Sequence, residues 1–205
     1  MTEPTACCAA RCCSPIAYCD NCDLLVGLDG LHVLDVVDAE EHLRVRVESP
    51  PGPMGCPACG VVALSHGRRE VELIDAPCFE RPTRVVWWKR TWSCLEPSCP
   101  VGVFTEQDEQ VARPRALLTT RACWWAVRQL RREHASVLGL ARQLGTTWKT
   151  VWRSIRPLLE VMDADPSRFD GVEILGVDEH VVRHEALLFR MEVEDLHGLV
   201  VVAAR

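Results

Sequence analysis

Two pairs of closely spaced cysteines constrain this chain of 205 residues more than any other feature. Cys56 and Cys59 are separated by two residues, and Cys94 and Cys99, which follow after 34 further residues, are separated by four. A tetrahedral zinc ion takes four ligands such as thiolates at about 2.3 Å, and two hairpin turns can supply them in pairs. Gly60, directly after the first pair, permits the tight turn of a zinc knuckle. The spacing therefore predicts a small zinc-ribbon-like β domain in which these four cysteines hold a structural Zn²⁺.

The compartment expected for the chain favours a metal over disulfides. Residues 1–22 contain no apolar segment like that of a signal peptide, and no apolar run is long enough to cross a bilayer. We therefore expect a cytoplasmic protein without a membrane partner, in which thiols stay reduced. Twelve cysteines in such a protein indicate metal binding. Two alternatives stay open: a redox pair at Cys56 and Cys59, which would require a strand-to-helix turn, and four thiols with no shared role.

The N-terminal half of the chain divides into a leader and a β-rich zone. Residues 1–22 are rich in cysteine and small residues without any periodicity, so we expect a disordered leader rather than a second metal site. Leu43, Val45 and Val47 alternate with charged residues, which is the period of a half-buried strand and predicts a β hairpin before the cysteine pairs. β-branched and aromatic residues predict further strands at 70–75 and 82–92. The hairpin and the zinc-binding domain are expected to occupy residues 23–105.

Residues 115–163 carry the pattern of a helix-turn-helix. Ser136 is placed to cap one helix, Gly145 to end it, and Thr147 to cap the next. The spacing i, i+3, i+4, i+7 of apolar residues predicts one buried face on the first of these helices. That face consists of Val137, Leu140, Ala141 and Leu144.

The charge of this zone indicates an anionic partner. Residues 111–160 contain ten Lys or Arg and two acidic residues, a balance of +8 in a chain whose net charge is −6. We expect double-stranded DNA as that partner, and the alternative is a helical hairpin with a solvated basic face. Trp148 and Trp152 are expected to pack in the core or beside phosphates rather than to stack on bases. The expected DNA-binding residues are Arg142, Thr147, Lys149, Thr150, Arg153 and Arg156.

The last zone, residues 170–205, begins with an apolar run over 172–177 that ends at Asp178. In RNase H-like nucleases a carboxylate on the first strand helps to hold two divalent ions for phosphoryl transfer. Many strands end in an acid, so this pattern is weak by itself. His180 and His184 stand four residues apart as in zincins, but no glutamate lies between them, which argues against that class.

Taken in order, these motifs resemble bacterial insertion-sequence transposases of the ISL-three group. The resemblance rests on "CPACG", on "CLEPSC" followed by Phe104, on "VLGLARQLGTTWKTVWR" and on "LGVDEH", and it runs from about residue 23 to about residue 181. It implies a zinc-binding N-terminal domain, a helix-turn-helix that binds the inverted repeats of the element, and a DDE catalytic domain of RNase H-like fold. By the same resemblance Asp178 matches the first catalytic aspartate. A complete family member would use Mg²⁺.

The chain departs from the family after this motif. Members continue with a second aspartate and a glutamate, whereas this sequence ends at Arg205, so we expect a truncated copy with only the first strands of the catalytic domain. Such a copy would bind DNA in the cytoplasm, at the nucleoid, without cleaving it, and whether the chain is an enzyme stays open. Besides DNA, a second copy of the chain is a possible partner, in a homodimer. A transcription regulator built from a zinc ribbon and a helix-turn-helix, without catalysis, is the alternative function.

Overall fold

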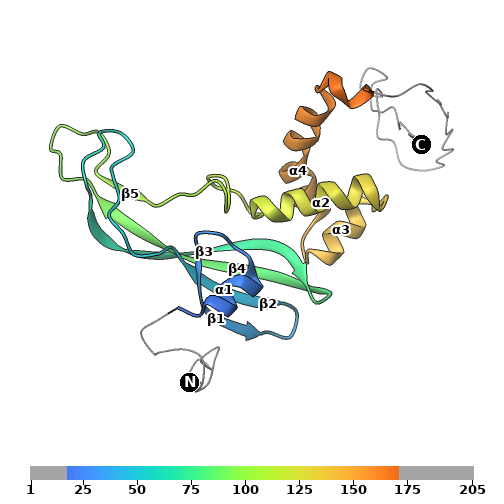
Figure 1. Cartoon of the computed structure of the whole chain (residues 1–205), viewed down its shortest axis with the longest axis horizontal. Coiled ribbons are helices and arrows are strands. Elements are labelled where there is room, and N and C mark those ends of the chain that lie inside the picture. The colour runs from blue at the N-terminus through green and yellow to red at the C-terminus, as the bar shows by residue number, and fades with distance from the viewer. Residues whose placement is uncertain (1–17, 171–205) are drawn as a thin grey trace. The chain divides into compact units, whose positions relative to one another are not determined.

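The computed structural model describes residues 18–170. The chain forms two compact units, Met1–Leu159 and Glu160–Arg205, and the second is described only as far as Asp170. The helices are α1 (Asp20–Val26), α2 (Thr120–Arg132), α3 (Val137–Gln143), α4 (Trp148–Asp163) and the short 3₁₀ helix η1 (Pro166–Phe169) (Figure 1). The strands are β1 (His32–Asp38), β2 (Leu43–Glu48), β3 (Leu64–Cys78), β4 (Arg81–Ser93) and β5 (Val103–Thr105).

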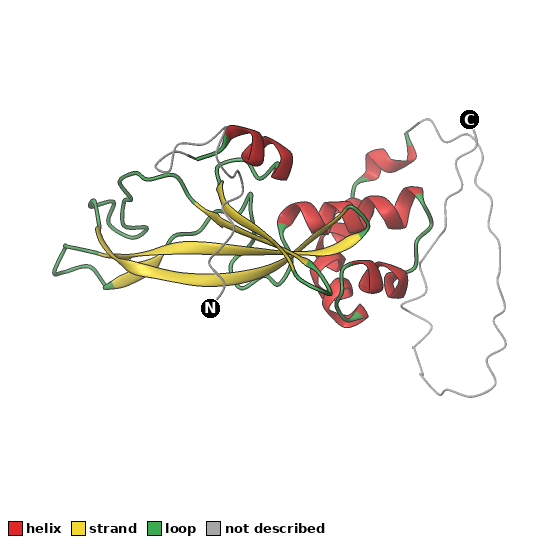
Figure 2. Ribbon diagram, turned by 90° about the horizontal axis from the view of Figure 1, so that it is seen from below, coloured by secondary structure: helices red, strands yellow, loops and turns green. Residues whose placement is uncertain are grey.

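All five strands belong to one sheet, which is built around the long hairpin of β3 and β4 (Figure 2). Strand order is β1-β2-β4-β3, and β5 also pairs with β4. β3 covers one edge of β4, while the other edge pairs first with β2 over Thr83–Trp87 and then with β5 over Thr91–Ser93. The β2–β4 pair is parallel and the other pairs are antiparallel. The hairpin and the later strands predicted from the sequence are confirmed.

The two faces of the sheet differ because side chains alternate along each strand. Val45 and Val47 of β2 are buried, and Arg44 and Arg46, which alternate with them, form ion pairs with acids on β1 and β3. Glu70 forms an ion pair with each arginine, with N–O distances of 3.7 Å to Arg44 and 3.3 Å to Arg46. One face therefore carries charges. The residues of the hydrophobic core include Cys19, Cys22, Leu28, Leu31, Val33, Val45, Val47, Leu73, Val85 and Trp87.

The prediction of a disordered leader over residues 1–22 is wrong for residues 18–22. Cys19 and Cys22 are each 9% exposed and pack in the core as small hydrophobic side chains. Tyr18 stacks on His32 with ring centroids 3.8 Å apart, and Gly27 ends α1 in the left-handed conformation. Residues 18–22 therefore belong with the sheet, because burial of their apolar surface offsets the entropy of ordering them.

Residues 1–17 and 171–205 are not described, so the strand expected from residue 172 and the candidate catalytic residue Asp178 lie outside the described residues. Within the part that is described, no helix has the length and apolar character needed to cross a membrane.

Candidate metal centre and nucleic-acid interface

The four predicted zinc ligands lie on two turns at the open end of the β3–β4 hairpin. In the first turn the amide of Cys56 donates to Val61 O and the amide of Gly60 donates to Cys56 O, both at 2.8 Å. Gly60 has a φ of 75°, so a residue with a Cβ would be strained there. In the second turn the amide of Cys94 donates to Gly102 O at 2.8 Å. We call these turns, residues 55–62 and 94–102, the cysteine knuckles.

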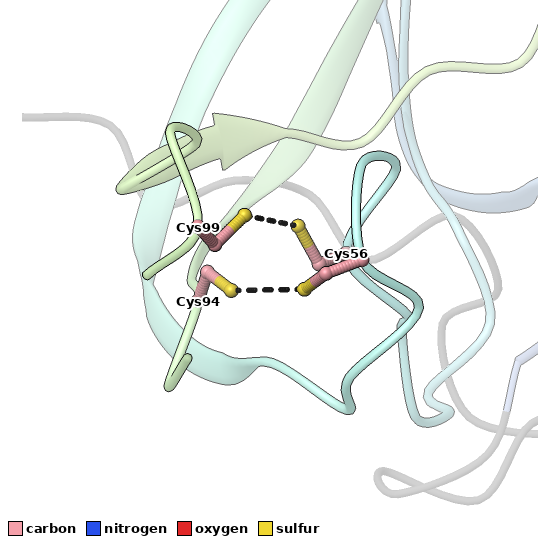
Figure 3. Close-up of side chains that lie close together, drawn as sticks. Cys56, Cys94 and Cys99 are labelled. Carbon is pink, nitrogen blue, oxygen red and sulfur yellow. Dashed lines mark hydrogen bonds between the residues drawn. The ribbon is translucent and has the colours of Figure 1, made fainter. Parts of the chain in front are cut away.

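Pairing of the two long strands brings the knuckles together. Leu64 at the start of β3 is opposite Ser93 at the end of β4, so the segment before one strand and the segment after the other leave the sheet side by side. Each knuckle contributes two sulfur atoms to the space between them (Figure 3). The strand register thus explains why cysteines more than thirty residues apart in the sequence meet.

The spacing of the sulfur atoms fits a tetrahedral metal ion. The Sγ atoms of Cys56 and Cys99 are 3.7 Å apart, those of Cys59 and Cys94 are 3.5 Å apart, and all four lie within 4.8 Å of one another. A regular tetrahedron with metal–sulfur bonds of about 2.3 Å has sulfur–sulfur edges of about 3.8 Å. The four cysteines could therefore bind one ion, in the arrangement of a structural zinc site.

The cysteine thiols of the cluster differ in pKa. Backbone N–H groups of Cys59 and Ala58 directed at the sulfur lower the pKa of the Cys56 thiol to about 6. The N–H of Glu96 acts on Cys94 in the same direction, but burial and the neighbouring thiols outweigh it and raise the pKa of Cys94 to about 12. One sulfur thus carries negative charge readily while a neighbour keeps its proton. A bound cation would reverse that balance, because metal ions displace protons from thiols.

The cluster consists of four cysteine sulfur atoms, which is the ligand composition of a structural zinc site. Among residues 18–170 it is the only group of three or more His, Cys, Asp or Glu side chains close enough to share an ion. Cys19 and Cys22, from the cysteine-rich segment 1–22, are core residues.

The three helices α2, α3 and α4 begin at side-chain caps. Thr119 Oγ1 accepts from the amide of Ala122 at 3.1 Å and caps α2. Ser136 Oγ accepts from the amide of Gly139 at 3.1 Å and caps α3, and Thr147 accepts from the amide of Thr150 at 3.2 Å at the start of α4. These bonds satisfy amides that have no partner inside the helix. The caps predicted at Ser136 and Thr147 are confirmed.

The turn between α3 and α4 is held by the sheet as well as by its own sequence. Gly145 has a φ of 59°, the left-handed conformation predicted for this position. Arg84 of β4 donates to Leu144 O at 3.0 Å and to Gly145 O at 2.7 Å, so it satisfies carbonyls that α3 leaves free. A Cβ on Gly145 would lie 3.1 Å from the Cβ of Pro82. Arg84 could not be recognised from the sequence, because nothing local marks an arginine whose partners are about sixty residues away.

A buried carboxylate fixes the beginning of α2. Asp75 of β3 is fully buried and accepts from Thr119 Oγ1 at 2.6 Å and from Arg121 Nε at 2.9 Å and 3.0 Å. Arg121 also donates to Gly27 O at 2.9 Å, at the end of α1. A single arginine thus ties a strand and two helices together. Neither Asp75 nor Arg121 could be recognised from the sequence as a residue that fixes α2, because each is one charged residue among many.

The buried faces of α3 and α4 are made by apolar residues, as predicted. Leu140, Leu144, Val151 and Ile155 have no exposed surface. Trp148 and Trp152 are 50% and 41% exposed, so of the two positions expected for them, in the core or beside phosphates, the first is wrong. Both lie at the edge of the face that α4 buries, because residues three apart, such as Trp148 and Val151 or Trp152 and Ile155, are neighbours on a helix. Of the residues expected to bind DNA, Arg142, Thr147, Lys149, Arg153 and Arg156 are exposed and Thr150 is half-buried.

Three short capped helices with a glycine turn before the last of them define the class of helix-turn-helix DNA-binding domains. Residues 109–158 match the helix-turn-helix domain of transposase family ISL3. The match covers α2, α3 and most of α4, and it supports an ISL3 transposase. No curated protein and no solved structure matches the chain.

Proposed function

We propose that this chain is the DNA-binding part of an ISL3 transposase and that it binds the inverted repeats of an insertion sequence through α4. The observation that carries the proposal is the exposed basic face of α4 inside a segment that matches a transposase helix-turn-helix. The match favours a transposase over a transcription regulator built from the same modules. Binding to chromosomal DNA would place the protein at the nucleoid, and a homodimer would suit the symmetry of paired repeats.

The charges of α4 suit a duplex. Lys149 and Arg153 are four residues apart and therefore lie one turn apart on one side of the helix, next to Arg156. Cations at that spacing can contact successive phosphates, while the first turn of the helix meets the base edges in the major groove. Thr150 in that first turn is the candidate for reading a base, because a threonine can offer its hydroxyl or its methyl group.

Fluorescence anisotropy of the full chain with a labelled duplex, at several salt concentrations, tests this proposal. Each neutralised phosphate contributes about −0.9 to the slope of log K against log salt, so the triple variant Lys149→Ala, Arg153→Ala, Arg156→Ala should flatten the slope by about 2.7. Arg69→Ala removes an exposed charge on β3 and should leave the slope unchanged. No binding at low salt, or the same slope in the triple variant, would refute the proposal.

Thr150→Ala should behave differently from the charge variants. If Thr150 reads one base, its loss should cost about 1–3 kcal/mol at one position of a selected site and leave the salt slope unchanged. Selection of preferred sequences from a random duplex pool, carried out with both proteins, measures this. An unchanged preference at every position would remove Thr150 from the recognition surface.

The metal proposed for the four cysteines is Zn²⁺. Thiolates are soft ligands and zinc prefers them in tetrahedral sets, whereas Mg²⁺ prefers oxygen. The ion would connect the two cysteine knuckles and so stabilise the open end of the β3–β4 hairpin.

The strand-transfer activity of the family would use Asp178, in a two-metal mechanism with Mg²⁺. Asp178 is the one carboxylate of this chain to which the resemblance assigns a catalytic role, and one carboxylate does not hold two ions. We therefore expect the purified chain to leave duplex DNA intact with Mg²⁺ or Mn²⁺. Nicking by the chain that disappears in Asp178→Asn would overturn this expectation.

A further inference from the structure

The two tryptophans at the start of α4, Trp148 and Trp152, are only partly covered by the packing of the helix-turn-helix and have no part in the charge argument above. Four tryptophans in the described part of the chain are substantially exposed, and two of these, Trp148 and Trp152, stand one turn apart on α4. A scattered exposed apolar residue needs no explanation, but adjacent large ones mark interaction surfaces. The half-exposed indoles, which stand between the buried face of α4 and its basic residues, leave an apolar surface that a partner of α4 could cover.

The helix geometry places both indoles beside the basic residues. Residues four apart lie one turn apart on the same side of a helix, so Trp148, Trp152 and Arg156 form one line along α4. Lys149 and Arg153 form the adjacent line, and Lys149 Nζ lies 5.8 Å from the centre of the Trp148 ring. The exposed surface of α4 is therefore mixed, with an apolar line and a cationic line that face the same partner.

The position of the indoles within α4 indicates which part of a duplex they would meet. α4 begins at Trp148, and both tryptophans lie within its first five residues. In a helix-turn-helix the N-terminal residues of the second helix contact base edges in the major groove. The apolar group that the major groove presents there is the 5-methyl group of thymine.

We propose that Trp148 and Trp152 contact thymine methyl groups and so give the helix-turn-helix a preference for A·T pairs. This rests on the proposed DNA binding and adds a chemical class of target to it. Lys149 and Arg153 of the cationic line would bind phosphates whatever the DNA sequence, whereas Trp148 and Trp152 of the apolar line would make binding depend on the base pairs. The salt dependence of binding and the preference for thymine should therefore respond to different substitutions.

Uracil in place of thymine removes the methyl group and keeps every phosphate and every hydrogen-bonding group of the base pair. We would compare the full chain on a duplex of about 24 A·T pairs in mixed order, roughly two helical turns, with the same duplex carrying uracil. Burial of one methyl group is worth about fourfold in affinity, so two contacts predict about 15-fold tighter binding to the thymine duplex. The comparison uses the unaltered protein and does not depend on any variant folding.

The double variant Trp148→Ala, Trp152→Ala should bind the two duplexes equally and keep the salt slope of the unaltered chain. Trp124→Ala is the matched control, since Trp124 is 40% exposed but lies on α2, and it should keep the preference for thymine. The triple charge variant should also keep that preference while its slope flattens. Circular dichroism checks that each variant is folded.

Equal affinity of the unaltered chain for the two duplexes would overturn the inference, as would a thymine preference that survives in the double variant. If the indoles instead pack against a second copy, the double variant would change the sedimentation of the free chain and the two duplexes would bind alike, which also overturns it. Failure of the proposed function looks different, because then neither duplex binds at low salt.

Discussion

The carboxylate of Asp75 offers the sharpest test of how the helix-turn-helix is held to the sheet. Asp75→Ala would leave Arg121 without its ionic partner and would remove an acceptor from the Thr119 hydroxyl. Breaking a buried ion pair by removing one partner costs about 3–5 kcal/mol. The side chain of Arg121 is 34% exposed and can recover some hydration, so the lower end of that range applies, about 3 kcal/mol.

This loss is large relative to the stability of a domain, which is about 5–15 kcal/mol. For a chain of this size 1 kcal/mol corresponds to about 2–4 °C in Tm, so Asp75→Ala should unfold about 6–12 °C earlier. Thermal unfolding followed by circular dichroism measures the shift. Urea unfolding of the same variant gives the free energy directly, if the transition is two-state.

Glu72→Ala is the matched control, because Glu72 lies three residues earlier on the same strand and also pairs with an arginine. Its side chain is 56% exposed and lies 3.9 Å from Arg84 Nε. Because the carboxylate is exposed and the contact is long, the pair should contribute about 0–1 kcal/mol, so Tm should fall by at most a few degrees. Equal shifts for the two variants would refute the argument that burial makes Asp75 the anchor of α2.

Three further predictions address the other parts of the structure. Cys59→Ser should lower the zinc content of the purified chain from one ion to none. Hydrogen exchange should then rise in the cysteine knuckles, because a structural zinc contributes about 10–16 kcal/mol of folding free energy in small domains. A wild-type chain that contains no zinc would contradict this prediction. Gly145→Ala should destabilise the chain more than Gly30→Ala when both are measured by urea unfolding, because both have positive φ but only Gly145 has close neighbours for a new Cβ. Burial raises the pKa of Cys123 to about 11 from its usual 9.0, so iodoacetamide at pH 8 should leave Cys123 unmodified in the folded chain, and mass spectrometry should detect its reaction only at higher pH or after unfolding.

The features that could be predicted from the sequence are those whose signals are local. Ser136 and Thr147 are caps because a hydroxyl lies three residues before the amide that it accepts from, and this spacing is visible in the sequence. Gly145 is recognisable because few other residues adopt a positive φ easily. The strands around Val45 and Val85 follow from alternation and β-branched content.

Contacts between distant segments could not be predicted in the same way. The parallel pairing of β2 with β4 joins residues forty apart, and no residue in either strand marks its partner. The same holds for Arg84 at the α3–α4 turn and for Asp75 at the start of α2, which resemble surface charges until the fold buries them. Cys19 was assigned to a leader because a small side chain carries no periodic signal, although it packs in the core. The four-cysteine cluster is the exception, because the geometry of a metal imposes a spacing that the sequence retains.

The distribution of burial along the β3–β4 hairpin explains why a metal cluster stands at one end of it. The first seven residues of β3 are exposed, whereas Leu73 and Trp87, further along the hairpin, are almost fully buried. The core therefore stabilises one half of the hairpin, whereas next to the cysteine knuckles the start of β3 is exposed and few apolar residues, among them Ala63 and Trp92, are buried. A bound ion would supply the missing stability there, as in other domains too small for a full core. Asp75 and Arg84, which hold the helix-turn-helix, lie in the half that the core stabilises. Loss of the metal should therefore open the knuckles and still leave the salt dependence of DNA binding close to that of the intact chain.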